Sequence, residues 1–192
     1  MNWNRVPRVA LLLMAALVAG CAGTPESRRE QPQTETAITP ELRSEYQQVV
    51  ALVAQDPARA RQELQRLHQA YPDLNGPLLN LCILDFNDER YEAAQACFER
   101  VLARDPEQPD ALNHLGVIAR RNGAFGEAED YYRRALTANP EHRPSLRNLG
   151  ILLDLYRGEH REALRLYEQY QALLPEPDPM VAQWVADLKN RL

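Results

Sequence analysis

The sequence lacks the short motifs that mark most enzymes and metal-binding proteins. Its 192 residues include no glycine-rich loop that would hold a phosphate group, and no serine stands in the sharp turn that presents a nucleophile. None of the four histidines (His68, His114, His142 and His160) has a second histidine or cysteine at the spacing of a metal site. We therefore predict a non-enzymatic protein with no metal or cofactor, in which His68, His142 and His160 are solvated residues at helix ends.

Positive charge is scarce as well. Lysine and arginine together number 22 against 27 aspartates and glutamates, which gives a formal net charge of −5. The basic residues do not form a stripe along which a phosphate backbone would lie. The composition therefore argues against nucleic acid as a partner.

Long hydrophobic runs are also missing. The longest, at 9–19, has eleven residues, whereas a membrane-spanning helix needs about 20. It follows a start that carries Arg5 and Arg8 and ends at Val18-Ala19-Gly20-Cys21, which is the layout of a secretion signal. The final four residues resemble the lipobox of bacterial lipoproteins, in which the cysteine becomes the first residue and carries lipid. We predict a signal peptide at 1–20 and lipidation of Cys21; a plain secretion signal is the alternative.

The resemblance to lipoproteins also implies a location. Several acyl chains on Cys21 would anchor the protein firmly, since each buried methylene contributes about 0.8 kcal/mol. Ala22, and not an aspartate, follows the cysteine. In enteric lipoproteins this goes with the outer membrane, so we expect an outer-membrane protein that faces the periplasm, with inner-membrane anchoring as the alternative. Residues 21–39 are rich in Thr, Glu, Gln and Pro with almost nothing to bury, and predict a disordered tether.

The rest of the chain repeats itself with a 34-residue period. Prolines stand at Pro72, Pro106 and Pro140, and the same interval relates alanines, large apolar residues and leucines that precede a small residue. These sets are Ala60, Ala94 and Ala128; Leu64, Phe98 and Tyr132; and Leu81, Leu115 and Leu149. A fixed period of this length indicates one helical hairpin that is copied and stacked on itself.

The residues that carry this period resemble the tetratricopeptide repeat (TPR) family. The resemblance implies an all-α, right-handed α-solenoid at 40–175 with about four hairpins, in units at about 41–74, 75–108, 109–142 and 143–177. The first unit is the weakest, because Gln47-Gln48 stands where the family has Leu-Gly. In the fourth unit Gly158, Ala163 and Tyr167 come one position later than the period requires, which predicts one inserted residue between Gly150 and Gly158.

A last helix is predicted at 178–192. Val181, Trp184, Val185, Leu188 and Leu192 form a single apolar stripe, which suits a lid on the exposed end of a stack. Trp184 as an anchor for a partner is the alternative. In total we expect about nine helices and no sheet.

The second unit contains two cysteines, Cys82 and Cys97. An oxidising compartment would allow a disulfide between them. We favour two buried thiols, because Cys82 occupies the small-residue position of its helix and Cys97 adjoins Phe98.

By the geometry of the family, the first helix of each unit lines a concave groove. The residues expected there are Leu79, Ile83, Phe86, Asn113, Val117, Arg120, Arg121, Arg147 and Ile151. This set implies an apolar floor with arginines towards one end, suited to an extended or helical peptide with hydrophobic anchors and some acidic character. One subset of TPR proteins binds the C-terminal carboxylate of its partner through asparagines in the groove. Apolar residues stand at the comparable positions here, so binding of C-terminal carboxylates is not expected.

These features together predict a non-catalytic, membrane-anchored adaptor that assembles or stabilises a protein complex of the bacterial envelope. Specific forms are a pilotin-like factor for type IV pilus or secretin assembly, an accessory of a TolQ/TolR- or ExbB/ExbD-like motor, and a recruiter of cell-wall enzymes. The alternatives from other classes are an enzyme subunit and a cytosolic chaperone-type module.

Lipidation gives a direct test of the sequence interpretation. Cells that express the chain and are fed labelled palmitate should incorporate the label into it, and Cys21→Ala should abolish incorporation, because the acylated thioether forms on that sulfur. Cys97→Ala is the matched control and should keep the label. A labelled Cys21→Ala protein would contradict the prediction.

Overall fold

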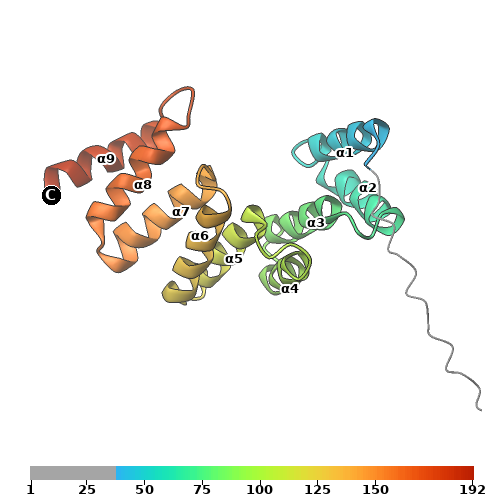
Figure 1. Ribbon diagram of the computed structural model, residues 1–192, viewed down its shortest axis with the longest axis horizontal. Coiled ribbons are helices and arrows are strands. Elements are labelled where there is room, and N and C mark those ends of the chain that lie inside the picture. The colour runs from blue at the N-terminus through green and yellow to red at the C-terminus, as the bar shows by residue number, and fades with distance from the viewer. Residues whose placement is uncertain (1–37) are drawn as a thin grey trace, which may run out of the picture. The chain divides into compact units, whose positions relative to one another are not determined.

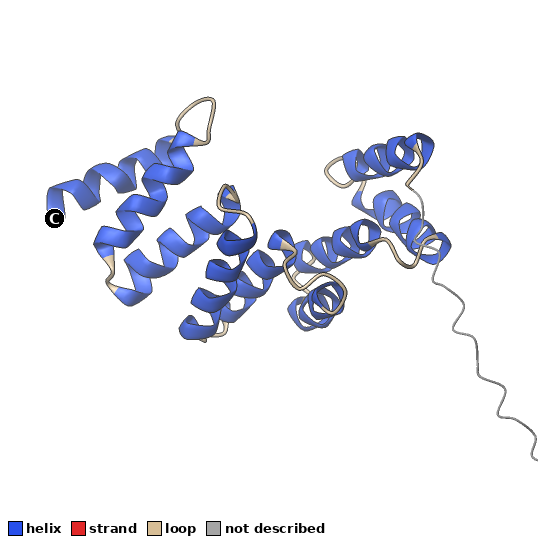
Figure 2. Cartoon of the chain, in the orientation of Figure 1, coloured by secondary structure: helices blue, strands red, loops and turns tan. Residues whose placement is uncertain are grey.

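The computed structural model describes residues 38–192, and this part of the chain consists of helices joined by short loops (Figures 1 and 2). The predicted signal peptide, Cys21 and nearly all of the predicted tether lie outside the described residues. Nine α-helices and one π-helical segment are present between residues 38 and 192, and that region contains no strand. They are α1 (Pro40–Leu52), α2 (Pro57–Ala70), α3 (Asn75–Asn87), α4 (Tyr91–Leu102), α5 (Pro109–Arg121), α6 (Phe125–Ala138), α7 (Arg143–Leu152), η1 (Leu153–Arg157), α8 (His160–Ala172) and α9 (Pro179–Arg191).

Local sequence explains where these helices begin and end. A proline is the first or second residue of five of them, where its missing N–H costs nothing. The side chain of Asp56 accepts a hydrogen bond from the Arg59 N–H and so caps the N-terminus of α2. Gly123 has a φ of +78° just after α5, a conformation that glycine adopts without strain and that ends the helix.

The helices pack as successive hairpins. Each pair α1/α2, α3/α4, α5/α6 and α7/α8 is in contact, and each hairpin packs on the next. The first helices of neighbouring units also touch, α3 against α5 and α5 against α7, while α9 packs on α8. Residues 38–192 all belong to one compact unit. The prediction of an all-α solenoid of hairpins is therefore confirmed.

A small residue opposite an aromatic ring sets the distance between the two helices of a hairpin. A Cβ atom added at Gly116 would lie 2.5 Å from Cε1 of Tyr132, and one at Gly150 would lie 2.5 Å from Cε1 of Tyr167. Both rings are fully buried. Glycine is needed at these two places because the ring occupies the space that any side chain would take.

The predicted one-residue insertion is confirmed, and it takes the form of the π-helical segment η1 directly after α7. A π-turn holds one more residue than an α-turn, so the extra residue is absorbed inside the helix. The contacts across the insertion show the shift. The Arg121 guanidinium lies 4.0 Å from the centre of the Tyr91 ring. In the next unit Phe125 stands one period after Tyr91, but its partner Tyr156 stands one period and one residue after Arg121. The ring centres of Phe125 and Tyr156 are 4.6 Å apart. Leu155, inside the segment, is 69% exposed.

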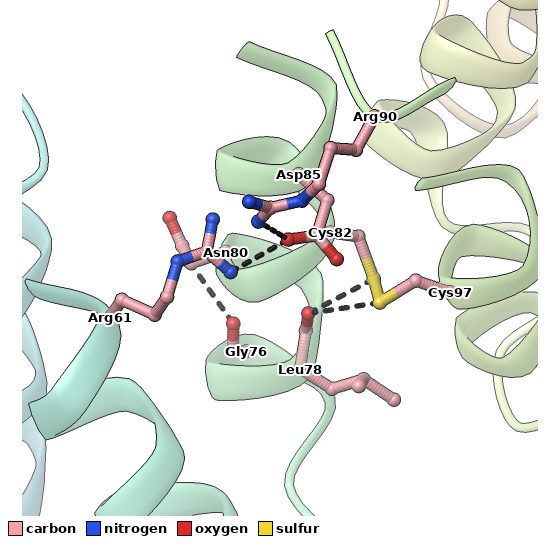
Figure 3. Close-up of a disulfide and its surroundings, with 8 residues drawn as sticks. All are labelled: Arg61, Gly76, Leu78, Asn80, Cys82, Asp85, Arg90 and Cys97. Atoms are coloured by element: carbon pink, nitrogen blue, oxygen red, sulfur yellow. Dashed lines mark hydrogen bonds and ion pairs between the residues drawn. A yellow bond between two sulfur atoms is a disulfide. The ribbon is translucent and has the colours of Figure 1, made fainter. Parts of the chain in front are cut away.

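Cys82 of α3 and Cys97 of α4 form a disulfide, so the expectation of two free thiols is wrong (Figure 3). Their Cα atoms are 5.3 Å apart, within the range of about 4.4–6.8 Å in which disulfides form. The physical reason is the helix approach described above. Cys82 occupies the same position in its unit as Gly116 in the next, where the facing helix comes close, and Cys97 on that helix lies within bonding distance.

Helix α9 covers the end of the stack, as predicted. Val181 and Leu188 are fully buried, and the Trp184 ring lies 5.4 Å from that of Tyr167. Val185 occupies the position in α9 that Gly150 has in α7, and its larger side chain fits because α9 has no second helix to approach it. Leu192 is 50% exposed, so the predicted stripe ends one turn earlier than expected.

The role of the small residues predicts opposite effects for two glycine substitutions. Gly116→Ala should lower the free energy of unfolding by about 1–3 kcal/mol, because the new methyl group overlaps the Tyr132 ring. Gly126→Ala is the matched control in the first turn of α6, where a Cβ meets nothing within 4 Å. It should leave stability unchanged or raise it by about 0.5 kcal/mol. Urea unfolding followed by circular dichroism measures both, and a Gly116→Ala protein as stable as the parent would contradict the packing argument.

Candidate functional site

The residues predicted to line a groove come from α3, α5 and α7, the first helices of three consecutive units. Ile83, Val117 and Ile151 occupy the same position of three successive repeats, one on each helix, and all three are half-buried. Each packs with one side against the core and keeps part of its surface open. They therefore place one apolar side chain per unit at the same register.

Two of the predicted groove residues are buried instead. Leu79 is 7% exposed and belongs to the core around the disulfide. Asn113 is 5% exposed, and its side-chain oxygen accepts a hydrogen bond from Asn148 Nδ2 at 2.9 Å. These two side chains hold neighbouring helices together and present little surface.

Phe86 takes part in an aromatic cluster. Its ring centre lies 5.5 Å from that of Tyr91 and 5.0 Å from that of His114, both in edge-to-face contact. His114 also stacks on Phe98 at 4.9 Å, and burial lowers its pKa. A neutral imidazole at neutral pH completes an apolar cluster between the second and third units.

The three predicted groove arginines are left without acidic partners. No carboxylate of the described residues lies within ion-pairing distance of Arg120, Arg121 or Arg147. The Nε atoms of Arg120 and Arg147 are buried and have no hydrogen-bond partner. Arg120 lies near the Tyr132 hydroxyl, whose pKa burial raises to about 12, so that neighbour stays neutral. A guanidinium in this state is suited to a carboxylate supplied by another molecule.

A cavity of about 300 Å³ adjoins Arg147. It is lined by Arg143, Arg147 and Asn148 of α7, together with Tyr170 near the end of α8 and Leu174 just after it. Arg143, like Arg147, makes no ion pair within the described chain. The fourth unit therefore offers positive charge beside an open hollow.

The structure also reveals a polar network that the sequence interpretation missed. His142 Nδ1 lies 2.8 Å from Ser145 Oγ, and His142 Nε2 lies 3.1 Å from Asp110 Oδ1. The residue types are those of a hydrolase triad, but Ser145 is fully buried and cannot reach a substrate. The network joins the third unit to the fourth.

His142 is 8% exposed, so the expectation of a solvated helix-end residue is wrong for it. One of its two partners, Asp110, lies 32 residues earlier on α5, and local sequence does not show that contact. The repeat period did indicate that position 142 takes part in a contact at the start of a first helix. His142 comes one repeat period after Gln108, and both stand just before a first helix, where Gln108 Oε1 accepts a hydrogen bond from the Asp110 N–H.

Two other kinds of site are missing from the described part of the chain. Among residues 38–192, no three side chains of His, Cys, Asp or Glu are grouped so as to hold a metal ion. Within the same range, every helix is too short or too polar to cross a bilayer.

Comparison with known proteins agrees with the repeated hairpins. Family models described as tetratricopeptide repeat match residues 43–74 and 83–143, so the chain contains TPR repeats. Comparison with curated protein sequences gives no match.

Several solved structures are similar to this fold. The structure of pilF from Pseudomonas aeruginosa is 20% identical, covers 78% of this chain and 68% of its own, and gives a TM-score of 0.66. A thermophilic TPR protein from Thermus thermophilus is 19% identical over 78% of this chain and 81% of its own, with a TM-score of 0.62. MamA from Desulfovibrio magneticus RS-1 is 17% identical over 81% and 87%, with a TM-score of 0.60. At these identities the similarity establishes the fold alone.

The polar network predicts a pH-dependent contribution to stability. The hydrogen bond with His142 lowers the pKa of Asp110 below its ordinary value of 3.8. A carboxyl group whose pKa is lower in the folded state than in the unfolded state stabilises the fold at pH values above its unfolded-state pKa. This stabilisation is lost as the pH falls through the folded-state pKa. The difference in unfolding free energy between the parent and Asp110→Asn should therefore be present at pH 7 and shrink at pH 3.

Chemical unfolding at the two pH values measures this difference. Glu107→Gln, an exposed change just before the same helix, is the control and should differ from the parent by little at either pH. An Asp110→Asn deficit of equal size at pH 7 and pH 3 would refute the assignment.

Proposed function

We propose that this chain is a non-catalytic adaptor that binds a segment of a partner protein on the face formed by α3, α5 and α7. The observation that carries the proposal is the combination on this face of one half-buried apolar side chain per unit with arginines that have no acidic partner among the described residues. TPR repeats generally serve as protein-binding scaffolds, which agrees with this function.

The geometry of the face limits what the partner segment looks like. Neighbouring packed helices lie about 8–10 Å apart, so Ile83, Val117 and Ile151 offer contacts at roughly that interval. A peptide in the polyproline II conformation has three residues per turn and advances about 3.1 Å per residue, so it would present an apolar side chain to this face at every third position. Arg120 and Arg147 lie towards the α5–α7 side and favour an acidic residue at that end of the segment.

We further propose that the adaptor is attached to the bacterial envelope through lipid on Cys21 and faces the periplasm from the outer membrane, with the inner membrane as the alternative. The disulfide between Cys82 and Cys97 supports a location outside the cytoplasm, because protein disulfides persist in oxidising compartments and are rare in the reducing cytosol. It also counts against a cytosolic chaperone-type module.

Three specific functions fit this proposal equally well. They are a pilotin-like function in secretin or type IV pilus assembly, an accessory function beside a TolQ/TolR- or ExbB/ExbD-like motor, and recruitment of cell-wall enzymes. An enzyme subunit is the less favoured class, because the triad-like set of side chains in the described region is closed to solvent at Ser145.

A crosslinking experiment tests the binding face. A photoreactive amino acid at Ile151 should give discrete adducts with envelope proteins, and Val117→Glu should reduce them at least about tenfold, because it puts a charge in the middle of the apolar line. Ala96→Glu adds the same charge to an exposed position of α4, a second helix, and should keep the adducts. Arg121→Glu, which reverses an exposed charge, is a second test variant that leaves the core untouched.

Circular dichroism and thermal unfolding establish that each variant folds. If folded Val117→Glu and Arg121→Glu proteins both keep the full adduct pattern, the partner does not use this face.

A further inference from the structure

The first unit contains a second hollow, away from the face proposed above. It has a volume of about 270 Å³ and lies between α1, the end of α2 and the start of α3. Leu42, Tyr46, Leu67, Tyr71, Leu74 and Pro77 give it an apolar wall. The repeat pattern favours the middle units as the binding surface and is weakest in the first unit, so this hollow has no assigned function.

The repeat explains why the hollow is apolar. Two units later, the equivalent positions carry Asp110, His114 and His142, which are joined by hydrogen bonds and close the boundary between the third and fourth units. In the first unit the same three positions, two repeat periods earlier, are Leu42, Tyr46 and Leu74. The polar side chains that close one unit boundary are thus replaced at another by apolar ones that leave space.

Two polar groups stand beside this apolar wall without partners. The side-chain oxygen of Asn75 is buried and accepts no hydrogen bond from any described group. Arg43 also lines the hollow and makes no ion pair with described residues. A buried acceptor without a donor destabilises the free protein, and a ligand that supplies an N–H removes that cost.

We propose that this hollow binds one bulky side chain of a partner peptide, best a tryptophan, whose indole N–H donates to Asn75 Oδ1 while an acidic neighbour in the peptide pairs with Arg43. Pockets for complete small ligands usually hold about 300–1,000 Å³, so a hollow of about 270 Å³ suits a single large side chain. Tryptophan combines a large apolar surface with one neutral N–H donor. The inference rests on the proposed function only in that the partner is a protein segment, and it does not depend on the α3–α5–α7 face.

The other candidate occupants match the hollow less well. An acyl chain fills apolar space but has no donor for Asn75. A second copy of this chain would have to offer a suitable side chain, yet Trp184, the tryptophan of the described residues, is packed against Tyr167. A peptide supplies both the donor and the charge that the hollow requires.

Small probes test the proposal directly. ¹⁵N-labelled protein covering residues 38–192, which belong to one compact unit, is titrated with N-acetyltryptophanamide, its N-methylindole analogue, N-acetylleucinamide and decanoate. N-acetyltryptophanamide should shift the amide signals of Leu74, Asn75 and Gly76 and bind about fivefold more tightly than the N-methylindole analogue, the effect of one hydrogen bond.

Variants assign the hydrogen bond. Asn75→Ala should weaken N-acetyltryptophanamide about fivefold, leave the N-methylindole analogue unchanged, and leave the free protein at least as stable as the parent. Asn87→Ala, at the exposed end of the same helix, is the matched control and should bind like the parent. A tryptophanamide probe extended by one glutamate should bind the parent more tightly than N-acetyltryptophanamide does, and Arg43→Gln should remove this difference in affinity.

Several outcomes would overturn the proposal. They are tighter binding of decanoate than of N-acetyltryptophanamide, equal binding of the N-methylindole analogue, and no binding of any probe. Shifts of the same signals that depend on protein concentration, without a probe, would identify a second copy of the chain as the occupant. Loss of probe binding in a protein that starts at Ala22 would show that the residues before the repeats fill the hollow. Val117→Glu should bind the probes normally, so a failure here and a failure of the α3–α5–α7 face are separate results.

Discussion

The close approach of the two helices in each hairpin is the constraint on which the rest of the structure depends. In the third and fourth units a glycine lies directly under a buried tyrosine ring, and neither partner has room to change alone. The distance so fixed determines how each hairpin presents its first helix to the next unit. In the second unit the same approach brings two cysteine sulfurs within bonding distance. The disulfide is thus a product of the packing rule that governs the whole stack.

The boundaries between units are where this chain departs from simple repetition. The boundary of the third and fourth units is closed by hydrogen bonds around His142, whereas the boundary of the first and second is lined by leucines and tyrosines and stays open. The π-helical segment shifts the register by one residue and still preserves the ring contact between Phe125 and Tyr156. One repeated scaffold therefore provides boundaries of different chemistry without any change in its helix pairing.

The sequence predicted the parts of this fold that depend on residues spaced along the chain. The 34-residue period gave the hairpins, and the longer interval to Tyr167 gave the insertion, because each acts within its own unit. Contacts between units were harder to predict. His142 looked solvated because its partner Asp110 lies 32 residues away. Leu79 and Asn113 were assigned to the groove because one helical step separates a groove-facing position from a buried one. The cysteine spacing alone did not distinguish a disulfide from two thiols.

The disulfide has a mechanical consequence. When the chain is pulled from both ends, tension passes from Cys82 to Cys97 through the sulfur–sulfur bond and bypasses residues 83–96. That loop, roughly 50 Å of extended chain at about 3.5 Å per residue, cannot be drawn out while the bond is intact. The part of the second hairpin between the two cysteines therefore carries no tension. Stretching would lengthen the molecule by unravelling its ends, and the crosslinked hairpin would survive as a short inextensible link.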